Sequence, residues 1–487
     1  MQIDIPNKVQ LISYADSLGG NLCAMRETLD RYFPSLFQVL HILPPFPSSG
    51  DRGFAPLCYT EIEKTFGTWD DIDALGEQYS ILVDLMVNHI SKHSPQFQDF
   101  LCNGRKSAFS DWFITLDKLW PGGVPNQNDL DMVYLRRPRP YSEYRTMAGN
   151  IERIWTTFGR EDPSEQIDLD VTSQGVLEMF EEIFTFFSRH GIKLVRLDAV
   201  GYVIKKMGTS CFLVEPEFQQ FLSWIKETAG KYNIQMLCEI HAETEIQNRL
   251  ARKGYWIYDF VLPYVVLETL LLGKSALLYR ILHDRPHNQF TTLDCHDGVP
   301  VMPDLDGIVD MERVRQVCDI CEERHSRFTK IVSEEHKSPD GFDVHQICGS
   351  YYSMLNNEDA YIAARAIQFF VPGIPQLYYV GLLAGENDEE RRIKTGDNRE
   401  ANRHNFTIDE INSAVQKPVV QRLCRLIRFR NSNCAFNGNF SFNDKNQDQV
   451  NLYWEKESEY CKLQIDLVTY QGCISYSENG NHMSFTI

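Results

Sequence analysis

The sequence lacks long hydrophobic runs and is poor in positive charge. No stretch approaches the roughly 18 uncharged apolar residues that a membrane-spanning helix needs. The 487 residues include 48 Lys+Arg against 67 Asp+Glu, so the formal net charge is −19. A chain this acidic repels the phosphate groups of nucleic acids and of anionic membranes. We therefore expect neither nucleic acid nor a membrane among its partners.

The sequence also lacks a disulfide or zinc pattern. Its 13 cysteines are scattered, and Cys318 and Cys321 form a CxxC with no second pair to complete a zinc site. Residues 1–6 lack the basic stretch and apolar core that begin a secretory signal. These features predict free thiols in a reducing, cytoplasmic setting.

The composition excludes a disordered chain, because 43% of the residues are hydrophobic and 12% are aromatic. We find no internal repeat and no low-complexity segment. The length suggests about three domains of roughly 150 residues each, which is enough to bury a large core.

Short apolar runs without strict alternation are typical of strands that are covered on both faces. Eight such runs occur, with helix-like segments between them. From Val176 to Phe187 the apolar residues follow the spacing of one buried helix face. Eight β-then-α units predict a (β/α)8 TIM barrel of the α/β class. The predicted strands are 9–14, 38–43, 81–87, 192–197, 234–240, 256–261, 290–293 and 374–380, and further predicted helices are 216–232, 243–253 and 266–282.

Two long segments interrupt the alternation after predicted strands, where loops of a barrel build active sites. Beyond residue 433 short strands with turn signals predict a small all-β domain. The expected division is barrel 1–90, inserted domain B 91–170, barrel 171–297, inserted domain B′ 298–356, barrel 357–434 and C-terminal β domain 435–487.

Three carboxylates lie at the ends of predicted barrel strands: Asp198 at the fourth, Glu239 at the fifth and Asp297 at the seventh. A single acidic residue after a strand is more often a helix cap. The carboxyl ends of parallel barrel strands share one rim, so these three side chains should converge. Such a set suits glycosyl chemistry, with a nucleophile, an acid/base and a group that stabilises an oxocarbenium-like transition state. Arg196 would face the same side as Asp198 and hold it ionised.

The segments at these strand ends resemble the four signature regions of the α-amylase clan, glycoside hydrolase family 13. They are 82–89, 194–198, 236–241 and 293–297. Nearly the whole chain resembles the sucrose phosphorylase subgroup of that family. The segments that carry this are 8–14, 41–44, 197–202, 208–212, 363–370 and 402–404. Segments 45–56 and 341–346 are similar to the branch of the subgroup that uses sucrose 6′-phosphate.

The resemblance implies a retaining double displacement that moves glucose from sucrose 6′-phosphate to inorganic phosphate. Asp198 would be the nucleophile, Glu239 the acid and then the base, and Asp297 the transition-state stabiliser. Phosphate would be a co-substrate, and neither a cofactor nor a metal is implied. The glucosyl subsite would be closed by Asp51, Phe54, His89, Gln166, Arg196, Tyr202, His296 and Arg399.

A phosphate ligand requires a local group of cations on this acidic chain. The resemblance suggests an arginine of the first inserted segment, either Arg136 or Arg137, together with His345 and Lys394. Arginine forks suit phosphate oxygens. Arg139 is as well explained by a solvated loop charge. The Arg-Pro-Arg-Pro run at 137–140 is similar to phosphorylases of unphosphorylated sucrose, whereas His345 favours the sugar-phosphate branch.

The sequence alone is also compatible with other functions. One is a phosphorylase for sucrose, glucosylglycerol or glucosylglycerate. A second is a retaining α-glucosidase, which would use the same three carboxylates with water as the acceptor. A third is a non-catalytic sugar-binding protein, which the presence of all three carboxylates disfavours. A monomer and a homodimer are equally compatible with the sequence.

Overall fold

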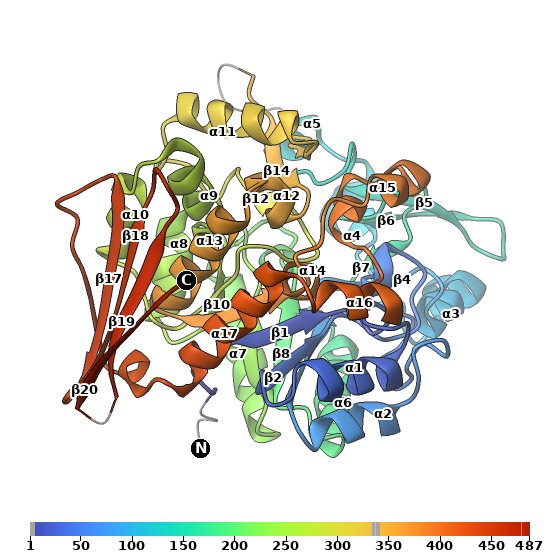
Figure 1. Ribbon diagram of the computed structural model, residues 1–487. Helices are drawn as coiled ribbons and strands as arrows, with labels where there is room; N and C mark the ends of the chain where they lie inside the picture. The colour runs from blue at the N-terminus through green and yellow to red at the C-terminus, as the bar shows by residue number, and fades with distance from the viewer. Residues whose placement is uncertain (1–4, 334–336, 338–340, 479) are drawn as a thin grey trace. The chain divides into compact units, whose positions relative to one another are not determined.

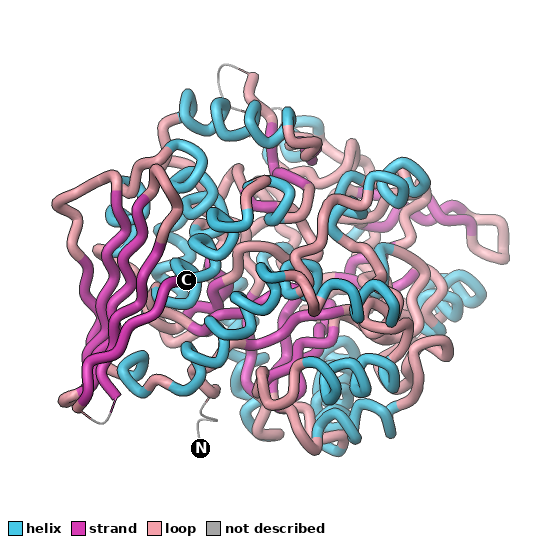
Figure 2. Tube along the Cα trace, in the orientation of Figure 1, coloured by secondary structure: helices cyan, strands magenta, loops and turns pink. Residues whose placement is uncertain are grey.

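The computed structural model of the chain describes residues 5–333, 337, 341–478 and 480–487. Residues 1–4, part of the segment on which the expectation about a secretory signal rests, lie outside these ranges. Strands and helices alternate along most of its length (Figures 1 and 2). The α-helices are α1 Leu22–Tyr32, α2 Trp69–Gly76, α3 Pro95–Asn103, α4 Leu116–Leu119, α5 Gln127–Met132, α6 Gln174–Arg189, α7 Glu217–Lys231, α8 Thr244–Arg252, α9 Leu262–Leu272, α10 Ala276–Leu282, α11 Met311–Glu323, α12 Tyr351–Leu355, α13 Glu358–Phe370, α14 Tyr379–Leu382, α15 Glu389–Thr395, α16 Ile408–Ala414 and α17 Pro418–Ser432.

Eight strands form a closed barrel in the order β1-β15-β11-β10-β9-β8-β3-β2. They are β1 Gln10–Ser13, β2 Val39–Ile42, β3 Ser80–Met86, β8 Leu194–Asp198, β9 Gln235–Cys238, β10 Trp256–Asp259, β11 Gln289–Thr291 and β15 Ile374–Tyr378. The pairings β1–β15, β15–β11, β11–β10, β9–β8 and β8–β3 are parallel. Almost every strand residue is buried, which explains the absence of polar alternation. The predicted (β/α)8 barrel is confirmed, and each predicted strand overlaps one barrel strand.

Most predicted strand ends differ from the observed ones by one or two residues, as at β9, β10, β11 and β15, and one predicted helix is two helices. The seventh strand ends at Thr291 rather than at residue 293, because Thr291 lies opposite Pro375, which has no backbone N–H to donate. The predicted helix 266–282 is two helices, α9 and α10. Gly273 follows α9 with a φ of 66°, a left-handed conformation that glycine adopts without strain, and its N–H donates to the carbonyl of Thr269.

The helix predicted from its apolar spacing forms as expected. α6 buries one face made of Val176, Phe180, Ile183, Phe184 and Phe187. Three aromatic rings meet this face: Phe46 stacks on Phe187, and Tyr59 and Trp69 contact the same ring. The hydrophobic face therefore packs α6 against α2 and the loop segments that carry Phe46 and Tyr59.

The chain divides into two compact units. The first contains Ile42–Ile240 and Ile331–Asp343, and the second contains Ile5–His41, His241–Lys330 and Val344–Ile487. In the first unit, β4 His89–Ser91 pairs antiparallel with β7 Gln166–Asp168, and β5 Tyr141–Arg145 with β6 Ile151–Trp155. The domain boundaries given above remain a proposal.

The second unit contains two antiparallel sheets outside the barrel. One has the order β12-β14-β13, with β12 Val299–Pro300, β13 Arg327–Lys330 and β14 Val344–Cys348. The other is the sheet β16-β17-β18-β19-β20 near the C-terminus (red in Figure 1). Its strands are β16 Asn439–Phe442, β17 Gln449–Lys456, β18 Glu459–Asp466, β19 Gly472–Glu478 and β20 Asn481–Thr486. The predicted C-terminal all-β region is confirmed.

All 13 cysteines, each in the described part of the chain, are free thiols, as predicted. Cys318 and Cys321 are buried on α11, and burial raises the pKa of each thiol to about 12. Both thiols are therefore protonated at neutral pH and serve as packing groups. Within the described ranges, no helix has the length and apolarity to cross a membrane.

Candidate active site

Strand β8 places Arg196 and Asp198 on the same face, because side chains two residues apart on a strand share a side. Register with β3 sets Asp84 beside Arg196. The Arg196 guanidinium contacts Asp84, and it donates to Asp198 at 3.2 Å. Its other terminal nitrogen lies 2.8 Å from the Glu239 carboxylate. One buried guanidinium therefore joins three carboxylates, including both groups predicted to do covalent and proton-transfer chemistry.

Glu239 directly follows β9, and its position is fixed through both oxygens. While Oε1 pairs with Arg196, Oε2 accepts from the backbone N–H of Ala199 at 2.9 Å. Ala199 has a φ of 52°, a left-handed conformation that a residue with a side chain adopts only under strain. The backbone after Asp198 is thus turned so that its N–H faces Glu239. Glu239 accepts in both of these contacts, so an acid role requires it to exchange one of them for the leaving oxygen.

Three predicted glucosyl-subsite residues meet at the Phe54 carbonyl in the first unit. His89 Nε2 donates to this oxygen at 2.9 Å, and Gln166 Nε2 donates to it at 3.0 Å. The β4–β7 pairing carries both side chains to this point. The Phe54 ring lies 5.6 Å from the Arg196 guanidinium, within range of a cation–π contact. Sequence reasoning named these four residues, and the structure brings them together.

His89 is held as a neutral imidazole. Since Nε2 carries the hydrogen that bonds Phe54, Nδ1 is left as the acceptor, 3.4 Å from the Asn88 amide nitrogen. Burial lowers the pKa of the ring below its ordinary value of 6.5. A neutral ring costs less to bury than a charged one, and it can present a hydrogen-bond donor at a defined position.

Asp51 lies in a strained turn of the first unit. Asp51, Arg52 and Gly53 have consecutive φ values of 45°, 51° and 110°. A Cβ on Gly53 would lie 2.4 Å from the carbonyl oxygen of Pro44, so only glycine fits there. The Asp51 carboxylate pairs with Arg160 at 3.1 Å. Arg160 was not singled out in the sequence, where it is one of many loop arginines.

Tyr202 belongs to an aromatic cluster of the first unit rather than standing alone. It lies at the end of the short 3-10 helix Val200–Tyr202. Its ring stacks on Tyr134 at 6.3 Å and meets Phe158 edge-on at 5.0 Å. The Arg136 guanidinium lies 5.8 Å from the centre of the Phe158 ring. One of the two arginines proposed for phosphate therefore adjoins the same aromatic cluster as a predicted sugar-binding residue.

Arg137, the other candidate arginine, is engaged inside the first inserted segment. Its side chain is only 8% exposed, and it donates to Ser142 Oγ at 3.0 Å, to Thr156 Oγ1 at 2.9 Å and to the Glu161 carbonyl at 2.9 Å. Arg139 is half-exposed and pairs with Asp162 at 2.9 Å. The structure thus distinguishes Arg136, which flanks the aromatic cluster, from two neighbours that stabilise their own loop.

In the second unit Asp297 lies between β11 and β12 and is held by two arginines. Arg399 donates to its Oδ1 at 3.0 Å, and Arg403 Nη2 lies 3.6 Å from the same oxygen. Arg403 Nε also donates to the His296 carbonyl at 2.7 Å. His296 Nε2 is 3.6 Å from the other Asp297 oxygen. Arg399 thus contacts the predicted transition-state stabiliser directly, and Arg403 fixes the backbone that carries it.

The two remaining candidates for phosphate binding differ in burial. His345 is buried on β14, and its Nδ1 bonds the Met302 carbonyl at 2.6 Å. Because a carbonyl only accepts, Nδ1 carries a hydrogen, so Nε2 would donate to a phosphate only from a protonated ring. Lys394 is exposed in the last turn of α15. His345 is therefore held in place by its surroundings, whereas the Lys394 side chain lies on the surface.

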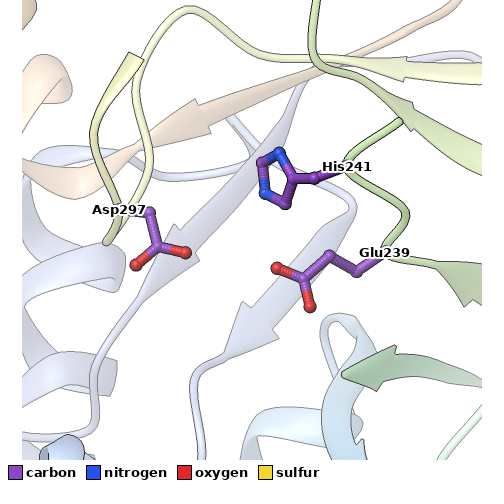
Figure 3. A group of neighbouring side chains, drawn as sticks. All are labelled: Glu239, His241 and Asp297. Carbon is purple, nitrogen blue, oxygen red and sulfur yellow. The ribbon is translucent and has the colours of Figure 1, made fainter. Parts of the chain in front are cut away.

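Figure 3 shows Glu239 and His241, which follow β9, and Asp297, which follows β11. Carboxylates and imidazoles of this kind are also metal ligands. Each already has a partner in its own unit: Arg196 for Glu239, Arg399 for Asp297, and Asp304 for His241 at 3.2 Å. His241 also stacks on Phe260 with ring centres 3.8 Å apart. The expectation that the site uses no metal remains a prediction.

Sequence reasoning missed a buried ion pair between Lys205 and Asp168 in the first unit. Lys205 is 1% exposed, and its ammonium lies 2.7 Å from Asp168, 2.6 Å from the Asn88 amide oxygen and 2.5 Å from the Tyr202 carbonyl. Asp168 ends β7, the strand that carries Gln166. A lysine in a run of mixed polarity carries no signal of burial, so only tertiary packing identifies it.

The sequence of the chain is similar to sequences of known proteins that belong to one family. Residues 15–257 match the alpha-amylase family, described as "Alpha amylase, catalytic domain". The chain is 56% identical over 486 residues to the sucrose 6(F)-phosphate phosphorylase of Thermoanaerobacterium thermosaccharolyticum, covering 99% of this chain and 100% of the relative. It is 40% identical over 464 residues to the glucosylglycerol phosphorylase of Marinobacter adhaerens, covering 95% of each.

A solved structure resembles the chain over its full length. The crystal structure of sucrose 6F-phosphate phosphorylase from Thermoanaerobacter thermosaccharolyticum has a TM-score of 0.98 and 56% identity, covering 100% of this chain and 99% of that chain. These matches confirm the resemblance inferred from the strand-end segments. The chain therefore belongs to the α-amylase family, glycoside hydrolase family 13, and within it to the sucrose phosphorylase subgroup.

Proposed function

We propose that the chain catalyses the reversible phosphorolysis of sucrose 6′-phosphate to α-D-glucose 1-phosphate and fructose 6-phosphate. The observation that carries this proposal is the full-length likeness to the Thermoanaerobacterium phosphorylase in sequence and in structure. The presence of Asp198 at the end of β8, of Glu239 after β9 and of Asp297 after β11 supports it. No cofactor takes part in the proposed chemistry, and inorganic phosphate is the second substrate.

In the first half-reaction an Asp198 oxygen attacks the anomeric carbon of the glucosyl unit. The glycosidic C–O bond breaks, and Glu239 gives its proton to the departing fructosyl oxygen. A β-glucosyl ester remains on Asp198. In the second half-reaction a phosphate oxygen attacks the same carbon, Glu239 takes the phosphate proton, and the ester bond breaks. Two inversions leave the product with the α configuration of the donor.

The contacts around Arg196 support these roles. In the free enzyme the guanidinium neutralises part of the charge of Asp84, Asp198 and Glu239, which keeps Asp198 available as an anion. Esterification removes the charge of Asp198, so Arg196 is then shared between two carboxylates instead of three.

For the fructosyl phosphate we propose Arg136, His345 and Lys394 as ligands, with Arg137 in a supporting role. Arg137 already makes three hydrogen bonds inside its loop, and recruiting it to a ligand would leave those partners unsatisfied. His345 would bind as an imidazolium, because Nδ1 is committed to Met302. Affinity for the phosphorylated leaving group would therefore rise as the ring gains its proton.

The decisive measurement is the ratio of kcat/KM for sucrose 6′-phosphate to that for sucrose, in phosphate buffer. We expect a ratio well above one. A ratio below one would assign the chain to phosphorolysis of unphosphorylated sucrose. A second assay compares products with and without phosphate: glucose as the main product at high phosphate would make the protein a hydrolase. Glucosylglycerol and glucosylglycerate as donors test the remaining alternative.

A pair of variants tests the phosphate assignment. Arg136→Ala should raise KM for sucrose 6′-phosphate with little effect on KM for sucrose, because only the former carries the charge. Loss of one charge-assisted contact corresponds to about a tenfold change or more. Arg137→Ala should instead lower thermal stability and affect both donors alike. Equal effects of Arg136→Ala on both donors would contradict a phosphate role for this arginine.

A further inference from the structure

The loop that carries Asp297 (Figure 3) is held by one short segment of the same unit, residues 399–403, which follows α15. Three side chains of this segment donate to three consecutive residues of the loop. They are Arg399 to the Asp297 carboxylate at 3.0 Å, Asn402 to the Cys295 carbonyl at 3.0 Å and Arg403 to the His296 carbonyl at 2.7 Å. The position of Asp297 therefore depends on what fixes this segment.

Glu400 lies within the segment and ties it to α15. Its side chain is 6% exposed, and both of its carboxylate oxygens are paired. Oε1 accepts from Arg403 Nη1 at 3.0 Å, and Oε2 accepts from Arg391 Nε. Arg391 lies in the first turn of α15, where its backbone N–H donates to the Asp388 carboxylate at 2.9 Å. Glu400 thus links Arg403 to a capped helix.

Arg403 is the link between Glu400 and the loop. It is 0% exposed, and its three side-chain nitrogens lie near three different groups. Nε donates to the His296 carbonyl, Nη1 donates to Glu400 at 3.0 Å, and Nη2 lies 3.6 Å from Asp297 Oδ1. A buried guanidinium needs a carboxylate close by. Glu400 is the nearer of these two carboxylates.

Both arginines that contact Asp297 also have a second carboxylate beside them. Arg403 has Glu400, and Arg399 Nε lies 3.6 Å from Asp397. Asp297 therefore shares each cation with another anion and keeps more of its own charge, which it needs to stabilise a developing positive charge. Without the charge of Glu400, the buried Arg403 would close on Asp297, displace it and neutralise more of it.

We propose that Glu400 is a positioning residue for the glucosyl transfer. It binds Arg403 and so keeps this guanidinium from closing on Asp297, which leaves the Asp297 carboxylate in place and charged. The inference rests on the function proposed above, because it takes Asp297 as the transition-state stabiliser.

Glu400→Gln tests the role of the charge, since it keeps the size of the side chain. With α-glucosyl fluoride as the donor and inorganic phosphate as the acceptor, we expect kcat to fall about tenfold or more. KM should change little, because Arg399 keeps its place. Glu268→Gln is the matched control, since Glu268 is a 0% exposed glutamate on α9 whose Oε1 accepts from Arg313 Nε at 2.8 Å. Both variants should lose thermal stability, and only Glu400→Gln should lose kcat.

A double-variant cycle with Arg403→Gln tests whether Glu400 acts through Arg403. Arg403→Gln alone should lower kcat, because the contact with the His296 carbonyl is lost. It also leaves no guanidinium for Glu400 to neutralise, so adding Glu400→Gln should cost little more. Losses of kcat that multiply would overturn the proposal, as would a change in KM alone or an equal loss of kcat in Glu268→Gln.

Asp297→Asn distinguishes a failure of this inference from a failure of the proposed function. If Asp297→Asn abolishes turnover while Glu400→Gln keeps the kcat of the wild type, only the positioning role is wrong. If Asp297→Asn leaves turnover unchanged, both are wrong. Should Glu400→Gln not fold, Glu400→Asp repeats the test with a carboxylate too short to reach both arginines. We expect a smaller loss of kcat from it, and an unchanged kcat would overturn the proposal.

Discussion

Removing the buried ammonium of Lys205 should destabilise the first unit strongly. Lys205→Met keeps the length and apolar stem of the side chain but leaves Asp168, which is 0% exposed, without its counter-charge. The Asn88 amide oxygen and the Tyr202 carbonyl also lose their donor. Breaking a buried pair from one side costs about 3–5 kcal/mol, and we expect the free energy of unfolding to fall by an amount in this range.

The assay is urea unfolding followed by far-UV circular dichroism, with thermal unfolding in parallel. Lys206→Met is the matched control, because the neighbouring Lys206 forms an exposed ion pair with Glu217, and such pairs contribute little. Asp168→Asn combined with Lys205→Met removes the orphaned charge and should recover part of the loss. Since β7 also carries Gln166, we further expect kcat/KM of Lys205→Met to fall at temperatures where it remains folded.

A Lys205→Met variant whose urea midpoint matches that of Lys206→Met would refute this reasoning. It would mean that the pair is solvated in solution or that Asp168 takes up a proton at little cost. Failure of the double variant to recover any stability would point instead to lost packing around the lysine stem as the source of the effect.

Three shorter predictions concern the chemistry and its pH dependence. Asp198→Asn should fold normally yet lose turnover by roughly 10⁴-fold or more, measured as glucose 1-phosphate release; unchanged turnover would exclude it as the nucleophile. Glu239→Gln should lose activity on sugar donors but regain the first half-reaction with α-glucosyl fluoride, whose leaving group needs no proton; absence of rescue would argue against an acid role. Because burial lowers the pKa of His89, its contribution to stability is complete above 6.5 and declines as the pH falls toward the lowered value. His89→Gln should therefore flatten the acid side of the stability profile, and an unchanged slope would assign that slope to other groups.

Much of this molecule was predictable from local sequence. The eight barrel strands are short apolar runs because both faces of each strand are covered, so their composition alone marks them. The positions of Asp198 and Glu239 also follow from sequence order, since each closes such a run. Two of the errors lie beside a residue that bears on the boundary: Pro375 opposite Thr291 of β11, and Gly273 at the end of α9.

Only the tertiary structure decided which polar groups are buried and what they contact. Arg136 and Arg137 are adjacent and chemically identical, yet one adjoins an aromatic cluster and the other bonds its own loop. Lys205 and Lys206 are likewise neighbours, one in a buried ion pair and one in an exposed pair. The sequence pattern around a charged residue does not show whether its side chain is buried, because burial depends on partners far away in the sequence. The sequence by itself therefore determined the barrel and its strand-end carboxylates, and the packing of distant segments determined which of the neighbouring cations are buried in ion pairs or hydrogen bonds of the fold.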